Sequence, residues 1–348
     1  MRGVVFLGDR KLELREFSDP KPGPGEVLLA MKASGMCGSD LHFYRATAGG
    51  TASLGLGAAE PVIAGHEPCG VVLERGPGVS EKEAPTGQRV MVHHYKGCGL
   101  CKHCRVGWAQ LCPSGIVVYG ATGHGGHAPY MKVPAFTLVP LDDTLSFEEG
   151  AAISCGTGTA YGALKRLDIS GRDTLAVFGQ GPVGLSATML GRAMGARVIA
   201  LDVVPERRKL AAEFGAEVVL DPGSTDPVKA LRDLTHGEGV DAALECSSHP
   251  GARVAAVQSV RTWGRACYVG EGGNVTLDVS KDLLRRQVTL MGSWTFSATG
   301  QEECARFIAD RKVPLGKLLT HRFTLDEAAA AYRLFDTQTT GKGVILFA

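Results

Sequence analysis

The sequence predicts an α/β protein in which a β-rich part is followed by a doubly wound parallel sheet. Three observations carry this prediction. Short strand-like runs separated by turn residues fill the first 150 or so positions. From about Ser154, helix-like and strand-like segments alternate. A glycine-rich turn stands between a buried strand and a helix at 179–184. With 348 residues and 44% hydrophobic content, the chain has room for two domains.

The first part is predicted to be mostly strands. A turn rich in proline and glycine spans 19–25, and a segment rich in Gly, Ala and Thr, 46–59, is predicted to be a surface loop. Alternating or continuous apolar runs predict strands over 4–7, 11–17, 27–33, 71–74, 89–93 and 130–133.

The second part is predicted to alternate between helices and parallel strands. Helices are expected over 159–167, 185–194, 206–214, 227–234 and 251–260, and strands over 175–178, 197–201, 217–220, 242–246 and 265–269. After about Trp294 we expect helices over 300–310 and 325–336 and a strand over 344–348. The predicted domains are therefore 1–153 with 296–348, and 154–295.

The turn Gly179-Gln180-Gly181-Pro182-Val183-Gly184 has the spacing G-x-G-x-x-G. In such a turn Gly179 permits the bend, Gly181 lets backbone N–H groups approach a pyrophosphate, and Gly184 lets helix and strand pack closely. The helix N-terminus then faces the phosphates. The alternative is an ordinary buried βαβ unit that uses glycine only for packing.

Asp202 ends the next strand, 18 residues after Gly184. Its carboxylate would accept hydrogen bonds from the adenosine ribose hydroxyls and repel a 2′-phosphate, which predicts NAD in preference to NADP. Arg207 and Arg208 follow closely and are compatible with some use of NADP.

Composition argues against several classes of partner. The net charge of +1 offers no broad electrostatic footprint for nucleic acid or a membrane. No apolar stretch reaches membrane-spanning length without a charge, and the first residues do not have the pattern of a signal peptide. We therefore expect a cytoplasmic protein.

Four of the ten cysteines, Cys98, Cys101, Cys104 and Cys112, lie within 15 residues in the pattern C-x2-C-x2-C-x7-C. In a cytosolic chain this crowding indicates metal binding rather than disulfides. Four thiolates so spaced close a tetrahedral zinc site with no open position, which predicts a structural zinc. Core packing is the expected role of Cys69, Cys246, Cys267 and Cys304.

Two further motifs are Gly35-Met-Cys-Gly-Ser-Asp-Leu-His42 and Gly65-His66-Glu67. Cys37, His66 and Glu67 are residue types that bind zinc. Taken alone, Cys37 is also compatible with a small core residue and His66 with a buried, hydrogen-bonded histidine.

The order of these motifs resembles the zinc-dependent medium-chain dehydrogenases, the superfamily of alcohol, sorbitol and threonine dehydrogenases. G-x-C-G-S-D-x-H comes first, then G-H-E, then four clustered cysteines, then G-x-G-x-x-G with a downstream aspartate. The resemblance covers the whole chain. It implies a GroES-like β-rich catalytic domain and a Rossmann coenzyme domain.

The resemblance also implies a second, catalytic zinc bound by Cys37, His66 and Cys155. A cysteine at 155 is typical of the alcohol dehydrogenases, whereas polyol and threonine dehydrogenases more often have an acidic residue there. Glu67 would lie close behind the metal and could replace a water or a ligand during turnover. Asp40 would orient His66.

In the mechanism that the resemblance implies, zinc polarises the substrate oxygen and the substrate carbon gives a hydride to the nicotinamide ring. The proton would pass through the Ser39 hydroxyl and the cofactor ribose to His42, which titrates in the useful range.

The resemblance implies cofactor contacts as well. Thr159 would lie beside the nicotinamide, Val203 against the adenine and Val269 near the carboxamide, and Lys342 stands where the family often has a phosphate-binding arginine. His93 is expected either to point at the active site or to be a buried structural histidine. Candidates for lining the substrate are Ser39, His42, Phe43, Trp108, Ile116 and Trp294.

The expected function is the interconversion of an alcohol or polyol, with a secondary hydroxyl favoured, and its ketone or aldehyde. An L-threonine 3-dehydrogenase or sugar dehydrogenase with the same mechanism is the alternative, and a non-catalytic zinc-ribbon or cofactor-binding protein a distant one. The expected partners are a small-molecule substrate and further copies of the chain, with a tetramer favoured over a dimer because the long lobe insertion of dimeric alcohol dehydrogenases is absent.

Overall fold

The structure, a computed structural model, describes residues 1–47, 61–339 and 341–348. The loop expected over 46–59 lies almost entirely outside the described residues. The chain forms two compact units: unit 1 comprises Met1–Gly158, Phe296–Gln338 and Lys342–Ala348, and unit 2 comprises Thr159–Thr295 and Thr339–Gly341. Residues 154–158, expected in the nucleotide-binding part, belong to unit 1.

Unit 1 is built on a seven-stranded sheet with the order β16-β17-β3-β4-β5-β9, in which β8 also pairs with β3. Its inward-facing side chains, among them Val27, Leu29 and Met31 of β3, form an apolar core. A separate antiparallel hairpin, β1–β2, precedes it. The strands are β1 (Arg2–Gly8), β2 (Lys11–Glu16), β3 (Glu26–Gly35), β4 (Glu67–Arg75), β5 (Arg89–Val92), β8 (Tyr130–Pro134), β9 (Leu138–Pro140), β16 (Leu319–Phe323) and β17 (Lys342–Leu346).

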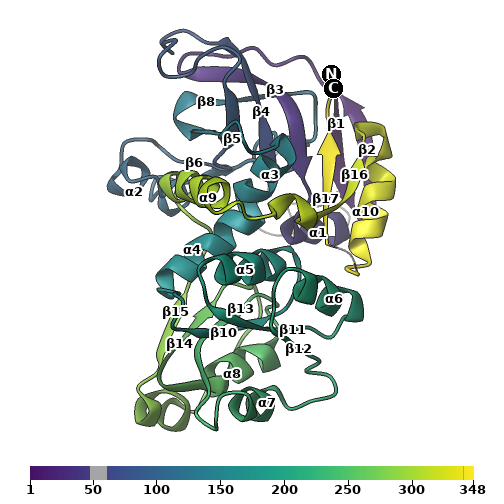
Figure 1. Cartoon of the computed structure of the whole chain (residues 1–348). Coiled ribbons are helices and arrows are strands. Elements are labelled where there is room, and N and C mark those ends of the chain that lie inside the picture. The colour runs from purple at the N-terminus through teal and green to yellow at the C-terminus, as the bar shows by residue number, and fades with distance from the viewer. Residues whose placement is uncertain (48–60, 340) are drawn as a thin grey trace. The chain divides into compact units, whose positions relative to one another are not determined.

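Strand β3 has two partners along one of its edges. Its first half, Glu26 to Ala30, pairs with β8, and its last three residues, Ala33 to Gly35, pair with β17. Figure 1 shows β17, in yellow, beside the purple β3. The last strand of the chain therefore supports the segment that leads into the G-x-C-G motif.

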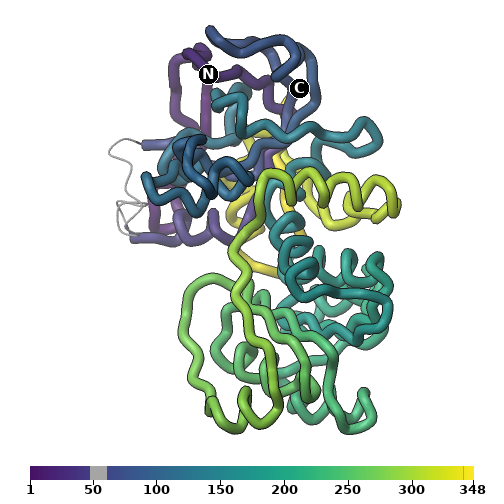
Figure 2. Tube along the Cα trace, turned by 90° about the vertical axis from the view of Figure 1, so that its left-hand side faces the viewer, coloured from purple at the N-terminus to yellow at the C-terminus, as the bar shows by residue number. Residues whose placement is uncertain are grey.

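Short helices cover the sheet of unit 1. The small β6–β7 ribbon (Tyr95–Lys96 and Val117–Val118) flanks the four-cysteine segment. In Figure 2 the yellow C-terminal part of the chain lies among purple N-terminal segments; there, Tyr332 and Phe335 of α10 pack with Met36 and Leu41. The helices are α1 (Gly38–Arg45), α2 (Lys102–Arg105), α3 (Phe147–Ala152), a π-helix (Ile153–Thr157), α9 (Ala298–Arg311) and α10 (Ala328–Asp336), with 3-10 turns at Ala109–Leu111, Ala135–Thr137, Leu315–Leu318 and Leu325–Glu327.

Unit 2 is a six-stranded parallel sheet with the order β12-β11-β10-β13-β14-β15. Helices lie on both faces, α5 and α6 on one and α7 and α8 on the other (Figure 1). The strands are β10 (Thr174–Phe178), β11 (Arg197–Leu201), β12 (Val218–Leu220), β13 (Val240–Glu245), β14 (Val260–Tyr268) and β15 (Thr289–Gly292); the helices are α4 (Gly158–Arg166), α5 (Pro182–Ala193), α6 (Pro205–Glu213), α7 (Pro227–Asp233) and α8 (Pro250–Ser259), with short helices at Val279–Leu283 and Leu284–Arg286.

The predicted fold class is confirmed, because a β-rich unit is followed by a doubly wound parallel sheet. Strands β15 and β16 are not among the predicted elements. Both are only partly buried, so their sequences lack the apolar run or the clean alternation that identifies a strand. Among the described residues, no helix combines the length and the apolar character needed to cross a bilayer.

Candidate active site, zinc sites and nucleotide site

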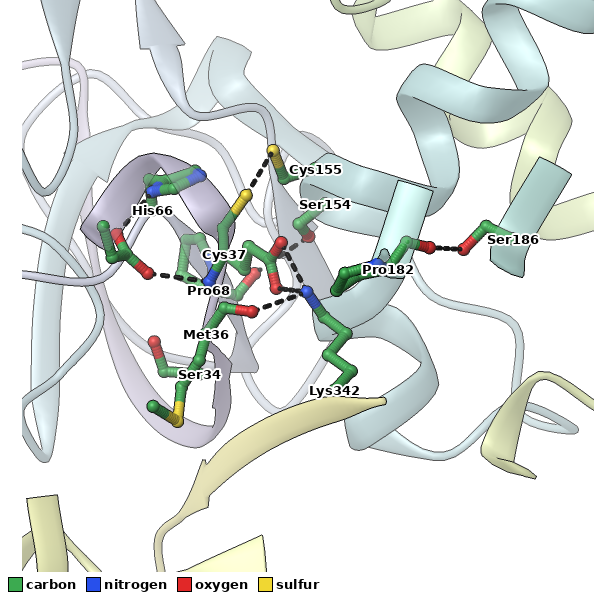
Figure 3. Close-up of polar contacts among 12 residues, drawn as sticks. Ser34, Met36, Cys37, His66, Pro68, Ser154, Cys155, Pro182, Ser186 and Lys342 are labelled. Carbon is green, nitrogen blue, oxygen red and sulfur yellow. Dashed lines mark hydrogen bonds and ion pairs between the residues drawn. The ribbon is translucent and has the colours of Figure 1, made fainter. Parts of the chain in front are cut away.

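Four potential metal ligands converge in unit 1. One ligand atom from each of Cys37, His66, Glu67 and Cys155 lies within 4.8 Å of every other. Cys37, His66 and Glu67 are buried, and Cys155 is half-buried. Figure 3 shows Cys37 and Cys155 pointing toward one another. The structure thus brings together the four residues expected at the catalytic zinc.

The backbone explains why these distant residues meet. Gly35 at the end of β3 is paired with Glu67 at the start of β4, so the two metal-binding motifs lie side by side. Cys37 is the N-cap of α1. Cys155 lies in the π-helix between α3 and α4, a local distortion that often accompanies functional sites.

The donor set and its spacing fit zinc. Two sulfur atoms bound at 2.3 Å to a tetrahedral zinc are about 3.8 Å apart. The Sγ atoms of Cys37 and Cys155 are separated by 3.8 Å. Thiolate and imidazole are the ligands that zinc prefers, so these residues would hold the metal with one position left for Glu67, water or substrate.

The potential metal ligands are ionisable groups whose pKa values are shifted in the protein interior. A hydrogen bond from Cys155 holds the pKa of Cys37 well below its usual value, and the same contact raises the pKa of Cys155. Burial raises the pKa of Glu67 to about 8 in spite of the nearby Lys342. Such a cluster of acidic groups in the protein interior favours a cation, because a divalent metal replaces the protons that these groups would otherwise retain.

Asp40 orients the imidazole of His66. Asp40 Oδ1 lies 2.9 Å from His66 Nδ1, and the backbone N–H of Cys37 donates to Asp40 Oδ2 at 2.9 Å. Burial disfavours the charged imidazolium, but Asp40 and Cys37 outweigh it and raise the pKa of His66 well above its usual value. With Nδ1 engaged by Asp40, the second ring nitrogen is left for the metal.

Lys342, which was expected at a phosphate contact, is buried beside Glu67 in unit 1. Its side chain is 1% exposed, and its ammonium group donates to Glu67 Oε1 at 2.7 Å and to the Met36 carbonyl at 2.9 Å. Figure 3 shows the Lys342 side chain directed at the carbonyl oxygen of Met36. The physical reason is that a buried ammonium group needs hydrogen-bond acceptors, and Glu67 and the Met36 carbonyl supply them in place of solvent.

His94, which is not among the predicted site residues, lies beside the metal-ligand cluster. Its ring centroid is 5.3 Å from that of His66, and its Nδ1 is 2.8 Å from the carbonyl oxygen of Ser154. His93, for which the sequence leaves a site role or a buried structural role open, is a buried histidine whose Nε2 lies 3.1 Å from the Phe296 carbonyl oxygen. Burial lowers the pKa of both rings. Adjacent histidines give no sequence signal for which one faces the site.

Ser39 and His42, the expected proton relay, are both exposed on α1. They are three residues apart and so share one face of the helix. Of the suggested substrate-lining residues, Phe43 is buried, Trp108 and Ile116 are half-buried, and Trp294 of unit 2 is exposed. The backbone N–H of Trp108 donates to the carbonyl of His103, which connects it to the four-cysteine segment.

The four clustered cysteines form a second candidate zinc site, and one Sγ from each lies within 4.8 Å of the others. The Sγ atoms of Cys101 and Cys112 are 3.9 Å apart, again close to the tetrahedral value. Backbone N–H groups of Leu100 and Cys101 donate to Cys98 Sγ and lower the pKa of that thiol to about 6. This geometry fits a closed zinc site.

In unit 2 the glycine motif has the predicted strand–turn–helix setting. Gly179 has a φ of +84°, which favours glycine, and a Cβ on Gly184 would lie 1.8 Å from the Gly179 carbonyl oxygen. Gly181 is the N-cap of α5, Pro182 is its first residue, and Val183 follows. Thr159 is buried, Val203 is 62% exposed, and the Val269 N–H donates to the Glu245 carbonyl.

Asp202 lies beside the glycine-rich turn. Its Oδ2 accepts from the Gln180 N–H at 2.6 Å and its Oδ1 from the Val204 N–H at 2.8 Å. Arg207 is near both, with an Nη1 atom 4.0 Å from the Cβ position of Gly181, and its buried Nε has no hydrogen-bond partner among the described residues. An acidic and a basic group thus flank the turn.

Comparison with known proteins agrees with both units. The alcohol dehydrogenase GroES-like domain family matches residues 23–143, and the zinc-binding dehydrogenase family matches residues 182–310. The chain is 42% identical over 357 residues to the uncharacterized zinc-type alcohol dehydrogenase-like protein YphC of Escherichia coli (strain K12), covering 100% of this chain and 99% of that protein.

Two further relatives have named activities. L-threonine 3-dehydrogenase of Pyrococcus horikoshii is 33% identical over 96% of this chain and 94% of that protein. The solved structure of the alcohol dehydrogenase TADH from Thermus sp. ATN1 superposes with a TM-score of 0.88 at 29% identity, covering 99% of each chain. Sequence, fold and metal-ligand geometry agree: the chain is an oxidoreductase and belongs to the superfamily of zinc-dependent medium-chain dehydrogenases.

Proposed function

We propose that this chain is a zinc-dependent, NAD-linked dehydrogenase that interconverts an alcohol or polyol, preferably at a secondary hydroxyl, and the corresponding ketone or aldehyde. The observation that carries the proposal is the convergence of Cys37, His66 and Cys155 with the sulfur spacing of a tetrahedral zinc. Membership of the superfamily and the G-x-G-x-x-G turn with Asp202 supply the link to a nicotinamide cofactor.

The chemistry that a bound zinc supplies is Lewis-acid polarisation of the substrate oxygen. Cys37, His66 and Cys155 would hold the metal, and Asp40 keeps His66 in the required tautomer. Ser39 and His42 would carry the substrate proton toward solvent, which is supported by their exposure on one face of α1.

We further propose a structural zinc on Cys98, Cys101, Cys104 and Cys112, so that each chain carries two zinc ions. The proposal is supported by the mutual spacing of the four sulfur atoms and by the N–H groups that donate to Cys98. A site with four thiolates has no open position for substrate.

NAD is the proposed cofactor, with NADP used less well. The carboxylate of Asp202 would face the adenosine ribose, where it would repel a 2′-phosphate. The unpaired Nε of Arg207 would moderate this preference without reversing it.

Within this range of substrates Cys155 favours an alcohol over a polyol, because polyol and threonine dehydrogenases more often have an acidic residue at that position. The second candidate is oxidation of L-threonine, which is the named activity of a relative that is 33% identical. Sugars also remain within the proposed range of secondary alcohols.

The test is NAD and NADP reduction by the purified protein against polyols, sugars, secondary and aromatic alcohols and L-threonine, with and without a chelator. We expect chelator-sensitive NAD reduction with one substrate class. Cys37→Ser and His66→Ala should lose turnover but retain NAD binding, whereas the matched control Cys267→Ala, a buried cysteine of unit 2, should remain active. Full activity of either site variant would refute the zinc assignment.

A cytoplasmic homo-oligomer, with a tetramer favoured, completes the proposal. The ten cysteines form no disulfide bond, which fits a reducing compartment. Light scattering after gel filtration measures the number of chains in the assembly. The net charge of +1 supports the absence of nucleic-acid and membrane partners. Binding of nucleic acid at low salt would instead favour the zinc-ribbon alternative.

A further inference from the structure

A chain of buried hydrogen bonds extends from the proposed zinc ligand His66 into the core of unit 1. His66 Nδ1 is 2.9 Å from Asp40 Oδ1, and the Tyr332 hydroxyl donates to Asp40 Oδ2 at 3.2 Å. The same hydroxyl is 2.7 Å from His127 Nε2, and His127 Nδ1 is 2.8 Å from Ser34 Oγ. We call these five residues the buried hydrogen-bond chain.

Only one arrangement of protons satisfies every member of this chain when the second nitrogen of His66 is reserved for a metal. His66 then donates from Nδ1 to Asp40, and Tyr332 donates its only proton to the other carboxylate oxygen. The oxygen of Tyr332 must therefore accept from His127 Nε2–H, which leaves His127 Nδ1 to accept from the Ser34 hydroxyl. Each link fixes the tautomer or rotamer of the next.

The members are deeply buried, so an unmade bond would not be replaced by solvent. Ser34, Asp40, His127 and Tyr332 are all 0% exposed. Leaving one such buried group without a hydrogen-bond partner destabilises the folded protein. Burial lowers the pKa of His127 to about 4, so its ring stays neutral at neutral pH and the proton arrangement is maintained.

The chain also contacts the backbone of the G-H-E motif. Gly65 has a φ of +90°, and a Cβ placed on it would lie 2.3 Å from His127 Nδ1. The imidazole of His127 therefore packs directly on the residue before His66. Tyr332 comes from α10 and packs in the cluster that contains Met36 and Leu41, which flank the segment of Cys37.

We propose that Tyr332 and His127 are positioning residues for the proposed zinc centre. They hold the Asp40 carboxylate in the orientation that aims His66 at the metal. This inference rests on the proposed function, since it assumes that Cys37, His66 and Cys155 bind zinc. It extends the metal's support to Tyr332 of α10, which is 292 positions from Asp40 in sequence.

The test compares zinc and cobalt binding by the Tyr332→Phe variant with binding by Tyr44→Phe. Tyr44 is the matched control because its buried ring is 5.6 Å from that of Tyr332 in the same cluster, but it does not belong to the chain. Affinities are measured by chelator competition on the full-length protein, and the visible spectrum of bound cobalt reports the ligand geometry. Neither readout depends on turnover.

We expect Tyr332→Phe to weaken metal binding at the Cys37 site by roughly 10- to 100-fold, the usual effect of losing such support, and to alter the cobalt spectrum. Binding at the four-cysteine site should be unchanged and serves as an internal reference for folding. His127→Leu should resemble Tyr332→Phe, whereas His127→Gln, which keeps a donor for Tyr332, should retain much of the affinity. Tyr44→Phe should bind like the wild type.

Equal affinities and spectra for Tyr332→Phe and Tyr44→Phe would overturn the inference and leave the proposed function intact. A wild-type protein that binds no zinc at the Cys37 site would refute the proposed function together with it. Equal weakening at both metal sites would mean a general loss of structure and would also count against a positioning role.

Discussion

At the scale of single residues, Asp202 carries the expected cofactor preference. Its carboxylate is hydrogen-bonded to the N–H groups of Gln180 and Val204 and lies beside the glycine-rich turn. We predict that Asp202→Ser raises kcat/KM for NADP relative to NAD by roughly tenfold or more, which corresponds to about 1.4 kcal/mol. The reason is that a fixed negative charge no longer opposes a 2′-phosphate. Steady-state kinetics with both cofactors measure the ratio.

Arg207 provides the control for this prediction, because its guanidinium lies near Asp202 and the turn and its Nε has no partner among the described residues. Adding Arg207→Ala to Asp202→Ser should reduce the gain with NADP. An unchanged cofactor ratio in Asp202→Ser would show that another residue selects the cofactor.

His127 should make the metal-free protein sensitive to mild acid. Burial lowers its pKa to about 4, and the charge of Asp40 only partly offsets this; the unfolded value is about 6.5. Because the folded pKa is the lower one, the stabilisation is complete above pH 6.5 and is lost as the pH falls toward 4. The neighbours that face the ring are Ser34, Tyr332, Asp40 and His66.

We therefore predict that the free energy of unfolding of the metal-free wild type falls by about 1.5 kcal/mol more than that of His127→Gln between pH 6.5 and 5. Denaturant titrations at the two pH values measure this difference. The histidines that do not face His127 are common to both proteins and cancel in the comparison. Parallel pH profiles would show that His127 does not titrate in this way.

At the scale of elements, the four-cysteine segment should behave as a separate structural module. Its sulfur atoms are held by the short helix α2 and by N–H groups of their own loop. We predict that Cys104→Ser lowers the zinc content by about one ion per chain and lowers the melting temperature. Metal analysis and thermal unfolding check this.

Cys267→Ser is the matched control for that prediction, since Cys267 is a buried cysteine far from the segment in sequence. It should retain both zinc ions. A Cys104→Ser protein with two zinc ions would contradict the assignment of a four-thiolate site.

The turn between β10 and α5 leaves no room for a side chain at Gly184. A Cβ there would lie 1.8 Å from the carbonyl oxygen of Gly179. We predict that Gly184→Ala lowers stability and weakens NAD binding by at least tenfold, because the turn must open to relieve the clash. Calorimetry of NAD binding and thermal unfolding measure both effects.

Gly171→Ala tests the same change in unit 2 without a clash, because the nearest atom to its Cβ would be 3.7 Å away. That variant should bind NAD as the wild type does. Normal NAD binding by Gly184→Ala would show that the turn can adjust at little cost.

The sequence was most informative where a function depends on short-range spacing. The glycine turn and the four-cysteine segment are each contained within 15 residues, so their local geometry follows from the pattern. The ligands Cys37 and His66 belong to similarly local motifs, and the resemblance to a known family connected them with Cys155.

The supporting contacts of the site could not be predicted in this way. The Lys342–Glu67 pair joins residues 275 positions apart, and the Tyr332–Asp40 bond joins residues 292 apart. Such pairs depend on β17 and α10 returning to β3 and α1, and no local pattern encodes that return. The contact of Lys342 with Glu67 was not expected for the same reason, because Glu67 is close to Lys342 only in space.

At the scale of the whole molecule, unit 1 depends on its last strand. Strand β17 lies between β16 and β3 and carries the buried Lys342. We predict that deleting 342–348 abolishes zinc binding at the Cys37 site and gives largely insoluble protein, because Glu67 is left without its counter-charge and the sheet is interrupted. Solubility and metal content measure the effect.

Deletion of Ala348 alone is the control. Its backbone oxygen accepts a hydrogen bond from the Lys32 ammonium group, and this bond is exposed to solvent. Its loss should therefore lower the stability only slightly. Soluble, zinc-loaded protein after removal of 342–348 would show that β17 is dispensable for the site.

The position of β17 in the sequence also delays the completion of unit 1 while the chain is being synthesised. Unit 2 is almost continuous in sequence, from Thr159 to Thr295, whereas the segment just before Cys37 pairs with residues that are translated more than 300 positions later. At ribosomal rates of about 5–20 residues per second, that wait lasts roughly 15–60 s. Throughout this interval the edge of β3 at Ala33–Gly35 that pairs with β17 has no partner. The thiol of Cys37, and that of Cys155 once it is made, lie in a unit that is still incomplete. The nascent chain is therefore most vulnerable to misassembly and to oxidation of its cysteines before β17 has been synthesised.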